Sequence, residues 1–459
     1  MLRDAYEIDK FFIGIQELTS EMDAQLAHID QLLDDDELYQ MVRQDLEQRY
    51  PLTRSTGRPS TPVEVILRTL VVKHMYGLSY EKTEQYVKDS LVLRRFCRVY
   101  LEKVPDHSTL NKWALTIKPD TLQALNARVV KLATELRVTS GRKLRTDGTL
   151  VETNIHYPTD SSLLADSVRV LSRTMKRAQQ VLEGVSDLAK ETFRDRTRSA
   201  RRAARQIGNA ARQGSQATRK TYRRLVDTAR ASIRQAQVVL EALQIETSAR
   251  ADKLRDTLQT FIPRARQVVG QTVRRVFEGE KVPPQDKLVS IFEPHTDIIK
   301  RGKANRDTEF GHKVWFDEAE GGIITNYRVL DGNPSDQNQW QPSLDHHVRQ
   351  FGRPPDLASA DRGVWSPDNE EYATNLSVKR VILPQRGAKS DDRKRYEKQA
   401  WFRRGRRWHA GIEGRISVTK RKYRLDRCLN QGEDGFQCWV GWGVIANNLT
   451  LMGRTLAQT

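Results

Sequence analysis

The run Lys143-Leu-Arg-Thr-Asp-Gly-Thr-Leu-Val-Glu152 reads as a β-strand and places Asp147 within it. Two further carboxylates stand in comparable settings. Asp361 closes the strand-like run Asp356-Leu-Ala-Ser-Ala-Asp361, and Glu413 lies in a helical stretch. Two Asp and one Glu, drawn from two strands and a helix, can hold a pair of Mg²⁺ ions about 4 Å apart over a scissile phosphate. The three residues therefore predict metal-dependent phosphoryl transfer.

Each carboxylate also has an ordinary structural interpretation. A single Asp at a strand end is more often a turn cap than a metal ligand, and a single Glu on a basic helix is usually an ion-pair partner. The histidines are scattered and do not suggest a histidine metal site. Four other acids have a similar pattern and are rival candidates: Asp160, Asp317, Asp331 and Asp356. Of these, Asp331 reads as a turn residue.

The composition favours a polyanionic partner. The 459 residues, long enough for two or three domains, include 77 Lys and Arg against 59 Asp and Glu, a net charge of +18. Such a balance indicates nucleic acid more often than a generally basic surface. No run of eighteen apolar residues and no signal-peptide core is present, so we expect no membrane span. Three cysteines without zinc-ligand spacing favour a reducing cytosol.

Residues 1–135 are expected to form a mostly helical region, with a loop at 51–62. A helix should begin with Pro62 at its first position and Glu64 completing a capping box, and residues 77–79 read as a turn before the next helix. Short helices joined by Gly- or Pro-marked turns, with Lys112 on one of them, resemble helix-turn-helix DNA-binding regions. A plain helical domain fits this pattern equally well.

Residues 163–284 have a different period. Apolar residues recur with alternating spacings of three and four, which predicts two long helices that fold back on each other as a hairpin. The first helix, from 163 to 205, would be roughly 60 Å long, and the turn would lie near Gly208 and Gly214. The repeating positions are Leu164, Val168, Leu171, Met175, Ala178, Leu182 and Val185, then Val226, Ala229, Ile233, Ala236, Leu240 and Leu243.

This hairpin carries most of the excess charge. Residues 164–280 contain 25 basic and 12 acidic side chains, and Arg194 to Arg224 contains eleven basic residues and one acid. A solvated charged helix normally mixes signs, so neutralising phosphates is the better explanation, and it predicts strongly salt-dependent binding. The candidate DNA contacts here are Arg201, Arg202, Arg205, Arg219 and Arg223.

From residue 285 onward the pattern is mixed α/β. We expect strands at 313–316, 323–330, 356–361 and 378–383, helices at 337–351 and 436–456, and one long basic helix at 396–423. Trp439 and Trp442 should be buried on the last helix.

Three blocks of this chain resemble the DDE transposases of bacterial insertion sequences, with the ISNCY-type group nearest. They are Asp147-Gly-Thr-Leu-Val-Glu-Thr-Asn-Ile-His-Tyr-Pro-Thr-Asp160, the Ala360-Asp-Arg-Gly363 turn and the helix from Glu413 to Lys420. The resemblance spans most of the chain and is specific in these blocks. Because all three carboxylates fall in them in the right order, the catalytic interpretation is preferred over the structural one.

The resemblance implies a mixed α/β fold. An RNase H-like catalytic domain, made of residues 136–162 and 285–459, would be interrupted by the helical hairpin at 163–284. An all-α DNA-binding region would occupy residues 1–135.

The resemblance also implies an activity. Two Mg²⁺ ions, with Mn²⁺ as a substitute, would be held by Asp147, Asp361 and Glu413, and would activate water or a DNA 3′-hydroxyl. Such a site cuts a transposon end and joins the freed end to target DNA. The partners would be double-stranded DNA and further copies of the chain in a dimer or larger synaptic complex, on nucleoid DNA in the bacterial cytoplasm.

Lys420 supports the assignment of Glu413. Seven residues make nearly two helical turns, so the two side chains share one face about 10 Å apart. Lys420 would contact a DNA phosphate near the cleaved end. Arg406 and His409 would lie on the same face, where related transposases often carry Tyr and Arg, and this departure leaves the roles of both residues open.

Two other functions fit parts of the sequence. One is a catalytically inactive DNA-binding protein derived from a transposase, although all three acids and Lys420 are present. The other is a helical scaffolding protein, which would leave the mixed α/β half unexplained.

Overall fold

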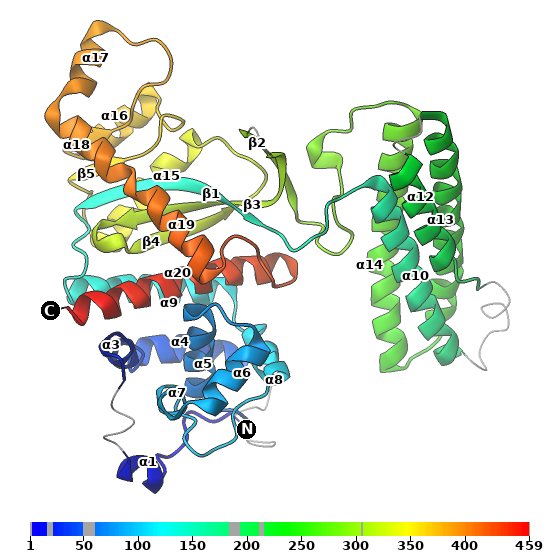
Figure 1. The fold of residues 1–459 in the computed structure, drawn as a ribbon, viewed down its shortest axis with the longest axis horizontal. Helices are drawn as coiled ribbons and strands as arrows, with labels where there is room; N and C mark the ends of the chain where they lie inside the picture. The colour runs from blue at the N-terminus through cyan, green and yellow to red at the C-terminus, as the bar shows by residue number, and fades with distance from the viewer. Residues whose placement is uncertain are drawn as a thin grey trace. The chain divides into compact units, whose positions relative to one another are not determined.

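A computed structural model describes residues 2–15, 22–48, 60–182, 193–210, 215–303 and 306–458. The chain divides into two compact units (Figure 1). Unit 1 comprises Met1–Asn154 and His312–Thr459, and unit 2 comprises Ile155–Gly311. The described part is mostly helical with one mixed sheet, which confirms the mixed α/β expectation.

The sheet combines parallel and antiparallel strands. Its order is β2-β3-β1-β5-β6, with β4 also paired to β3. Strands β1, β5 and β6 run parallel, whereas β3 is antiparallel to β4 and, through its first residues in unit 2, to β2. The strands are β1 (Lys143–Glu152), β2 (Asp297–Lys303), β3 (Arg306–Ala319), β4 (Ile324–Leu330), β5 (Leu357–Ser359) and β6 (Arg380–Ile382).

Helices cover both faces of the sheet in unit 1. Successive side chains of a strand point to opposite faces, and on β3 Trp315 packs in one cluster with Trp340 while Val314 and Phe316 pack in another with Trp439. Trp340 lies on α15 (Gln337–Phe351), whose bounds match the prediction, and Trp439 on α20 (Gly432–Leu456). Trp439 and Trp442 are buried, as predicted.

The N-terminal helices share their core with α20. This helix packs against α3, α5 and α9, and one apolar cluster contains residues of all four. At the predicted turn, Gly77 has φ +61°, and the Ser79 side chain accepts a hydrogen bond from the Lys82 amide at 3.2 Å. The helices are α1 (Lys10–Gly14), α3 (Ala24–Leu32), α4 (Asp36–Glu47), α5 (Val63–Met75), α6 (Tyr80–Asp89), α7 (Leu91–Phe96), α8 (His107–Ala114) and α9 (Pro119–Glu135).

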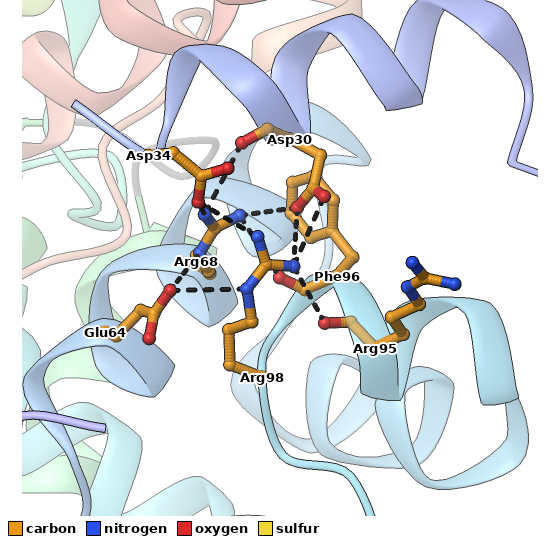
Figure 2. Close-up of polar contacts among 7 residues, drawn as sticks. All are labelled: Asp30, Asp34, Glu64, Arg68, Arg95, Phe96 and Arg98. Atoms are coloured by element: carbon orange, nitrogen blue, oxygen red, sulfur yellow. Dashed lines mark hydrogen bonds and ion pairs between the residues drawn. The ribbon is translucent and has the colours of Figure 1, made fainter. Parts of the chain in front are cut away.

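A buried charge network ties these helices together (Figure 2). The Arg68 side chain is 0% exposed and pairs with Asp30 at 2.6 Å, Asp34 at 2.5 Å and Glu64 at 3.2 Å. Arg98 pairs with the same three carboxylates at 2.9 to 3.3 Å. The expected capping box is therefore wrong, because Glu64 serves the two arginines and no side chain caps α5.

The predicted basic helix at 396–423 is three helices. They are α17 (Asp391–Lys398), α18 (Ala400–His409) and α19 (Gly411–Tyr423). Gln399 is extended with ψ 144°, and Gly411 fits against the Arg145 guanidinium, where a Cβ would lie 2.4 Å from Nη1. The prediction of one continuous helix through Arg406, His409 and Glu413 is therefore wrong, because α18 ends at His409 and α19 begins at Gly411. The remaining helix of unit 1 is α16 (Pro367–Asn375), which lies between β5 and β6 in the chain.

Unit 2 is a helical bundle. The described helices are α10 (Asp160–Leu182), α12 (Thr197–Ala210), α13 (Ser215–Leu243) and α14 (Ala249–Thr272), which pack on one another. A two-helix hairpin with one helix from 163 to 205 is thus wrong, because residues 193–196 are not helical. The heptad positions are nonetheless buried or partly buried in the bundle core. Val185 and Gly214 lie outside the described residues.

Across the part of the chain that the structure describes, no helix is both long and apolar enough to cross a membrane.

Candidate active site

Asp147, in the middle of β1, and Asp361, just after β5, lie beyond the same end of the segment over which these two parallel strands pair. The last paired positions of β1 and β5 are Arg145 and Ser359. Each aspartate stands two residues beyond its member of that pair, in the same direction along the chain. Asp361 begins the turn after β5, as predicted, and its carbonyl accepts a hydrogen bond from Val364. Register alone therefore juxtaposes two residues that are far apart in the sequence.

The two carboxyl groups have opposite electrostatic settings. Burial, and then the negative charge of Asp361, raise the pKa of Asp147 to about 6, although the Gly148 amide donates to its Oδ1 at 2.7 Å. A hydrogen bond from His409 lowers the pKa of Asp361, and burial acts in the opposite direction. A neighbouring pair of carboxylates with one raised pKa is deficient in positive charge, which is the condition that a divalent cation relieves.

His409 connects α18 to the end of β5. Its Nε2 lies 3.2 Å from Asp361 Oδ1, and its Nδ1 lies 3.3 Å from Ser359 Oγ. The imidazole is only 12% exposed, whereas the Asp361 carboxylate is 66% exposed. No sequence signal pointed to this contact, because it joins residues on separate elements.

Asp336 and Lys313 form a second ion pair near the two aspartates. Lys313 Nζ lies 2.5 Å from Asp336 Oδ1, and the Asp336 charge also raises the pKa of Asp147. Gly148 and Gly363 leave room for this pair, because a Cβ at either position would lie 3.2 Å from Lys313 Cε or Asp336 Oδ2. Sequence reasoning missed Asp336 and Lys313, since neither stands in a recognisable motif block.

Glu413 lies in the first turn of α19 and is exposed. This helix packs against β1, and its Arg415 reaches toward Glu318 at 3.6 Å. Among the described residues no three His, Cys, Asp or Glu side chains gather closely enough to hold a metal ion, so the structure does not bring Glu413 into one group with Asp147 and Asp361. Lys420 is partly buried in the last turn of the same helix.

The four rival acids have other settings. Asp317 is buried and accepts a hydrogen bond from Asn326 at 2.9 Å, and the partly exposed Asp356 pairs with Lys379 at 2.8 Å. Asp160 pairs with Arg275 at 2.9 Å within unit 2. Asp331 precedes Gly332, which has φ +65°, consistent with a turn.

The predicted DNA-contacting residues fall into two groups. Lys112 on α8 and Arg201, Arg202 and Arg205 on α12 are exposed. In the bundle, Arg219 donates hydrogen bonds to the carbonyls of Val276 and Phe277, at 3.2 and 3.0 Å, and the Arg223 guanidinium lies 5.7 Å from the Phe277 ring centre. The second pair is therefore partly engaged in holding unit 2 together.

The donor set fits a divalent cation in part. Carboxylate oxygens are the ligands that Mg²⁺ and Mn²⁺ prefer, and such sites often use only one or two protein carboxylates, with water and substrate phosphate supplying the rest. Asp147 and Asp361 meet that requirement, and a bound cation would favour the ionised form of Asp147.

Comparison with known protein families supports the same class. A transposase domain (DUF772) matches residues 15–114, and a transposase DDE domain matches residues 372–452. The first match covers most of the N-terminal helices, and the second covers α18, α19 and most of α20, including Glu413 and Lys420. Together they support an insertion-sequence DDE transposase, as the sequence resemblance indicates. No curated protein and no solved structure matches the chain.

Proposed function

We propose that the chain is a DNA transposase that binds the terminal repeats of an insertion sequence and catalyses metal-dependent strand cleavage and strand transfer. The observation that carries this proposal is the juxtaposition of Asp147 and Asp361 just beyond the paired segment of the parallel strands β1 and β5. It occurs in a unit with two transposase matches, within a mixed sheet whose order agrees with an RNase H-like domain.

Asp147 and Asp361 would hold the divalent ions. When bound, a pair of Mg²⁺ ions activates the attacking water or 3′-hydroxyl and neutralises the charge on the leaving oxygen. The role of the protein is to fix the two carboxylates: the Gly148 amide orients Asp147, and His409 orients Asp361. The restricted exposure of Asp147 limits competing water around its carboxylate.

Glu413 and Lys420 would complete the site from α19. Glu413 is exposed near the start of this helix, so its carboxylate is accessible to a metal or to DNA. Lys420 would contact a phosphate near the cleaved end, since ammonium groups bind phosphate as point charges.

Binding of duplex DNA would involve both units. Lys112 on α8 and the exposed Arg201, Arg202 and Arg205 of unit 2 offer phosphate contacts, and Arg219 and Arg223 would add to them. We place the activity on nucleoid DNA in the bacterial cytoplasm, in a dimer or larger synaptic assembly that holds two ends together.

The test is cleavage of terminal-repeat DNA in the presence of Mg²⁺ or Mn²⁺. The wild type should cut, Asp361→Asn should not, and Asp356→Asn should cut like wild type. The last variant is a matched control because Asp356 is a partly exposed aspartate just before the same strand, paired with Lys379. DNA binding without cleavage by the wild type would instead support an inactive, transposase-derived DNA-binding protein.

A further inference from the structure

Helix α18 presents a stripe of unpaired arginines. Arg403, Arg404, Arg406 and Arg407 are all exposed, and with Ala400 and Ala410 they line a cavity of about 600 Å³. None of the four makes an ion pair with another residue in the described ranges of the chain. We call these four residues the arginine stripe.

The neighbouring helix α17 shows that pairing is possible in this region. There Lys394 pairs with Asp391 at 3.0 Å, and Arg393 pairs with Glu370 at 2.8 Å and with Glu397 at 3.0 Å. Arg395 is likewise paired with Asp392. The four guanidinium groups on the next helix make no such ion pair among the described residues, so their charge is available to a ligand.

The opposite face of α18 is fixed against the sheet. Phe402 is buried, and Gly405 lies so close to Ile382 of β6 that a Cβ would be 2.5 Å from its Cδ1. Trp408 receives the Arg145 guanidinium 4.8 Å from its ring centre. The stripe is therefore held on a rigid element, and it runs toward His409, which contacts Asp361.

We propose that the arginine stripe binds the phosphate backbone of a DNA duplex that enters the Asp147 and Asp361 site. From Ala400 to Ala410 the helix spans about 15 Å, equal to roughly four phosphates of one strand. Guanidinium groups suit phosphate because their planar fork donates two parallel hydrogen bonds. Since contacts to phosphate oxygens carry no sequence information, we expect this contact to be independent of DNA sequence.

That the stripe guides DNA into an active site rests on the proposed function, but the binding of duplex DNA by the stripe does not. It can therefore be tested without cleavage, in EDTA, with the full-length chain and a fluorescein-labelled duplex. The variant is Arg403→Ala/Arg404→Ala/Arg407→Ala. The matched control is Lys394→Ala/Arg395→Ala/Lys398→Ala, which removes the same number of charges from α17. A Lys version of the stripe variant keeps the charge.

We expect the stripe variant to bind the duplex roughly tenfold or more weakly than wild type at about 0.1 M salt, and its salt slope to fall by about 2 to 3. The loss should be equal for terminal-repeat and scrambled duplexes, and the Lys version should regain most of it. The α17 control should change affinity less than about twofold. Thermal unfolding of each variant establishes that it is folded.

A stripe variant that loses no more affinity than the α17 control would overturn the proposal, as would a loss confined to one DNA sequence or to an RNA duplex of equal length. If the stripe variant binds weakly but wild type cuts no DNA, the proposed function fails and the duplex-binding stripe stands.

Discussion

Two clusters of guanidinium groups in unit 1 are built in opposite ways. Arg68 and Arg98 are surrounded by three carboxylates that they share, and Arg68 has no exposed surface (Figure 2). The arginine stripe of α18 is exposed and has no acidic partner among the described residues. The first cluster satisfies its charge within the fold, whereas the second leaves its charge for a ligand. Net charge therefore indicates a polyanionic partner only after the paired cations are set aside.

Removing an arginine from the buried network of Arg68 and Arg98 should have the largest effect on stability. Arg68→Ala leaves Asp30 and Glu64 with fewer partners at a buried site, and removing one side of a buried pair costs about 3 to 5 kcal/mol. Arg98→Ala should cost less, because its side chain is 15% exposed. Urea unfolding of both variants measures the difference, and equal losses below about 1 kcal/mol would mean that the network is not structural.

Lys73 is a buried cation with no carboxylate partner among the described residues. Burial lowers its pKa to about 8, although its Nζ lies 4.5 Å from the Tyr80 ring centre and 5.0 Å from that of Trp439. Between pH 8 and its unfolded pKa of 10.5 the unfolded chain binds more protons, so stability attributable to Lys73 rises with pH.

Lys73→Met should therefore stabilise the protein by about 3 kcal/mol below pH 8. The advantage over wild type should disappear as the pH approaches 10.5. Denaturant unfolding of both proteins from pH 7 to 10 tests this, and a difference that does not change with pH would contradict it.

Asp147 is a carboxyl group whose burial should also make the stability of the protein depend on pH. Its folded pKa of about 6 exceeds the unfolded 3.8, so its stability contribution is present at low pH and is lost as the pH rises through 6. Asp147→Asn should stabilise the metal-free protein by about 3 kcal/mol well above pH 6 and by nothing below pH 4. With Mg²⁺ present the advantage should shrink, because only wild type gains stability from the ion. Unfolding with EDTA and with Mg²⁺ separates these outcomes.

The smallest effect should come from an exposed paired cation. Arg395 on α17 is 78% exposed in its side chain and pairs with an equally exposed Asp392. Exposed pairs of this kind contribute about 0 to 1 kcal/mol, so Arg395→Ala should shift the unfolding free energy by less than about 0.5 kcal/mol. A loss of stability as large as that of Arg68→Ala would mean that exposed and buried ion pairs contribute equally to stability in this protein.

Local sequence pattern was sufficient for single elements. The bounds of β1 and α15 match the predictions, and the heptad positions of unit 2 are buried. The pattern failed where helix-forming residues continue across a break. Gln399 and Ala410 do not break a helix by propensity, and packing of α18 on β6 and of Gly411 on Arg145 decides the ends of the helices.

The site shows the same limit at longer range. Asp147 and Asp361 could be proposed from their motif blocks, but their proximity depends on the register of β1 with β5. The contacts of His409 with Asp361 and of Lys313 with Asp336 join elements whose packing no local pattern encodes. Glu413 as the third ligand stays a prediction.

The assignment of the active site depends most on whether Asp147 and Asp361 bind a divalent ion. Titration of Mn²⁺ into the full-length protein, followed by calorimetry, should show saturable binding for wild type and for Asp356→Asn. Binding should be lost in Asp147→Asn and in Asp361→Asn. Undiminished Mn²⁺ binding in both of these variants would contradict the assignment of the two aspartates as the metal-holding pair.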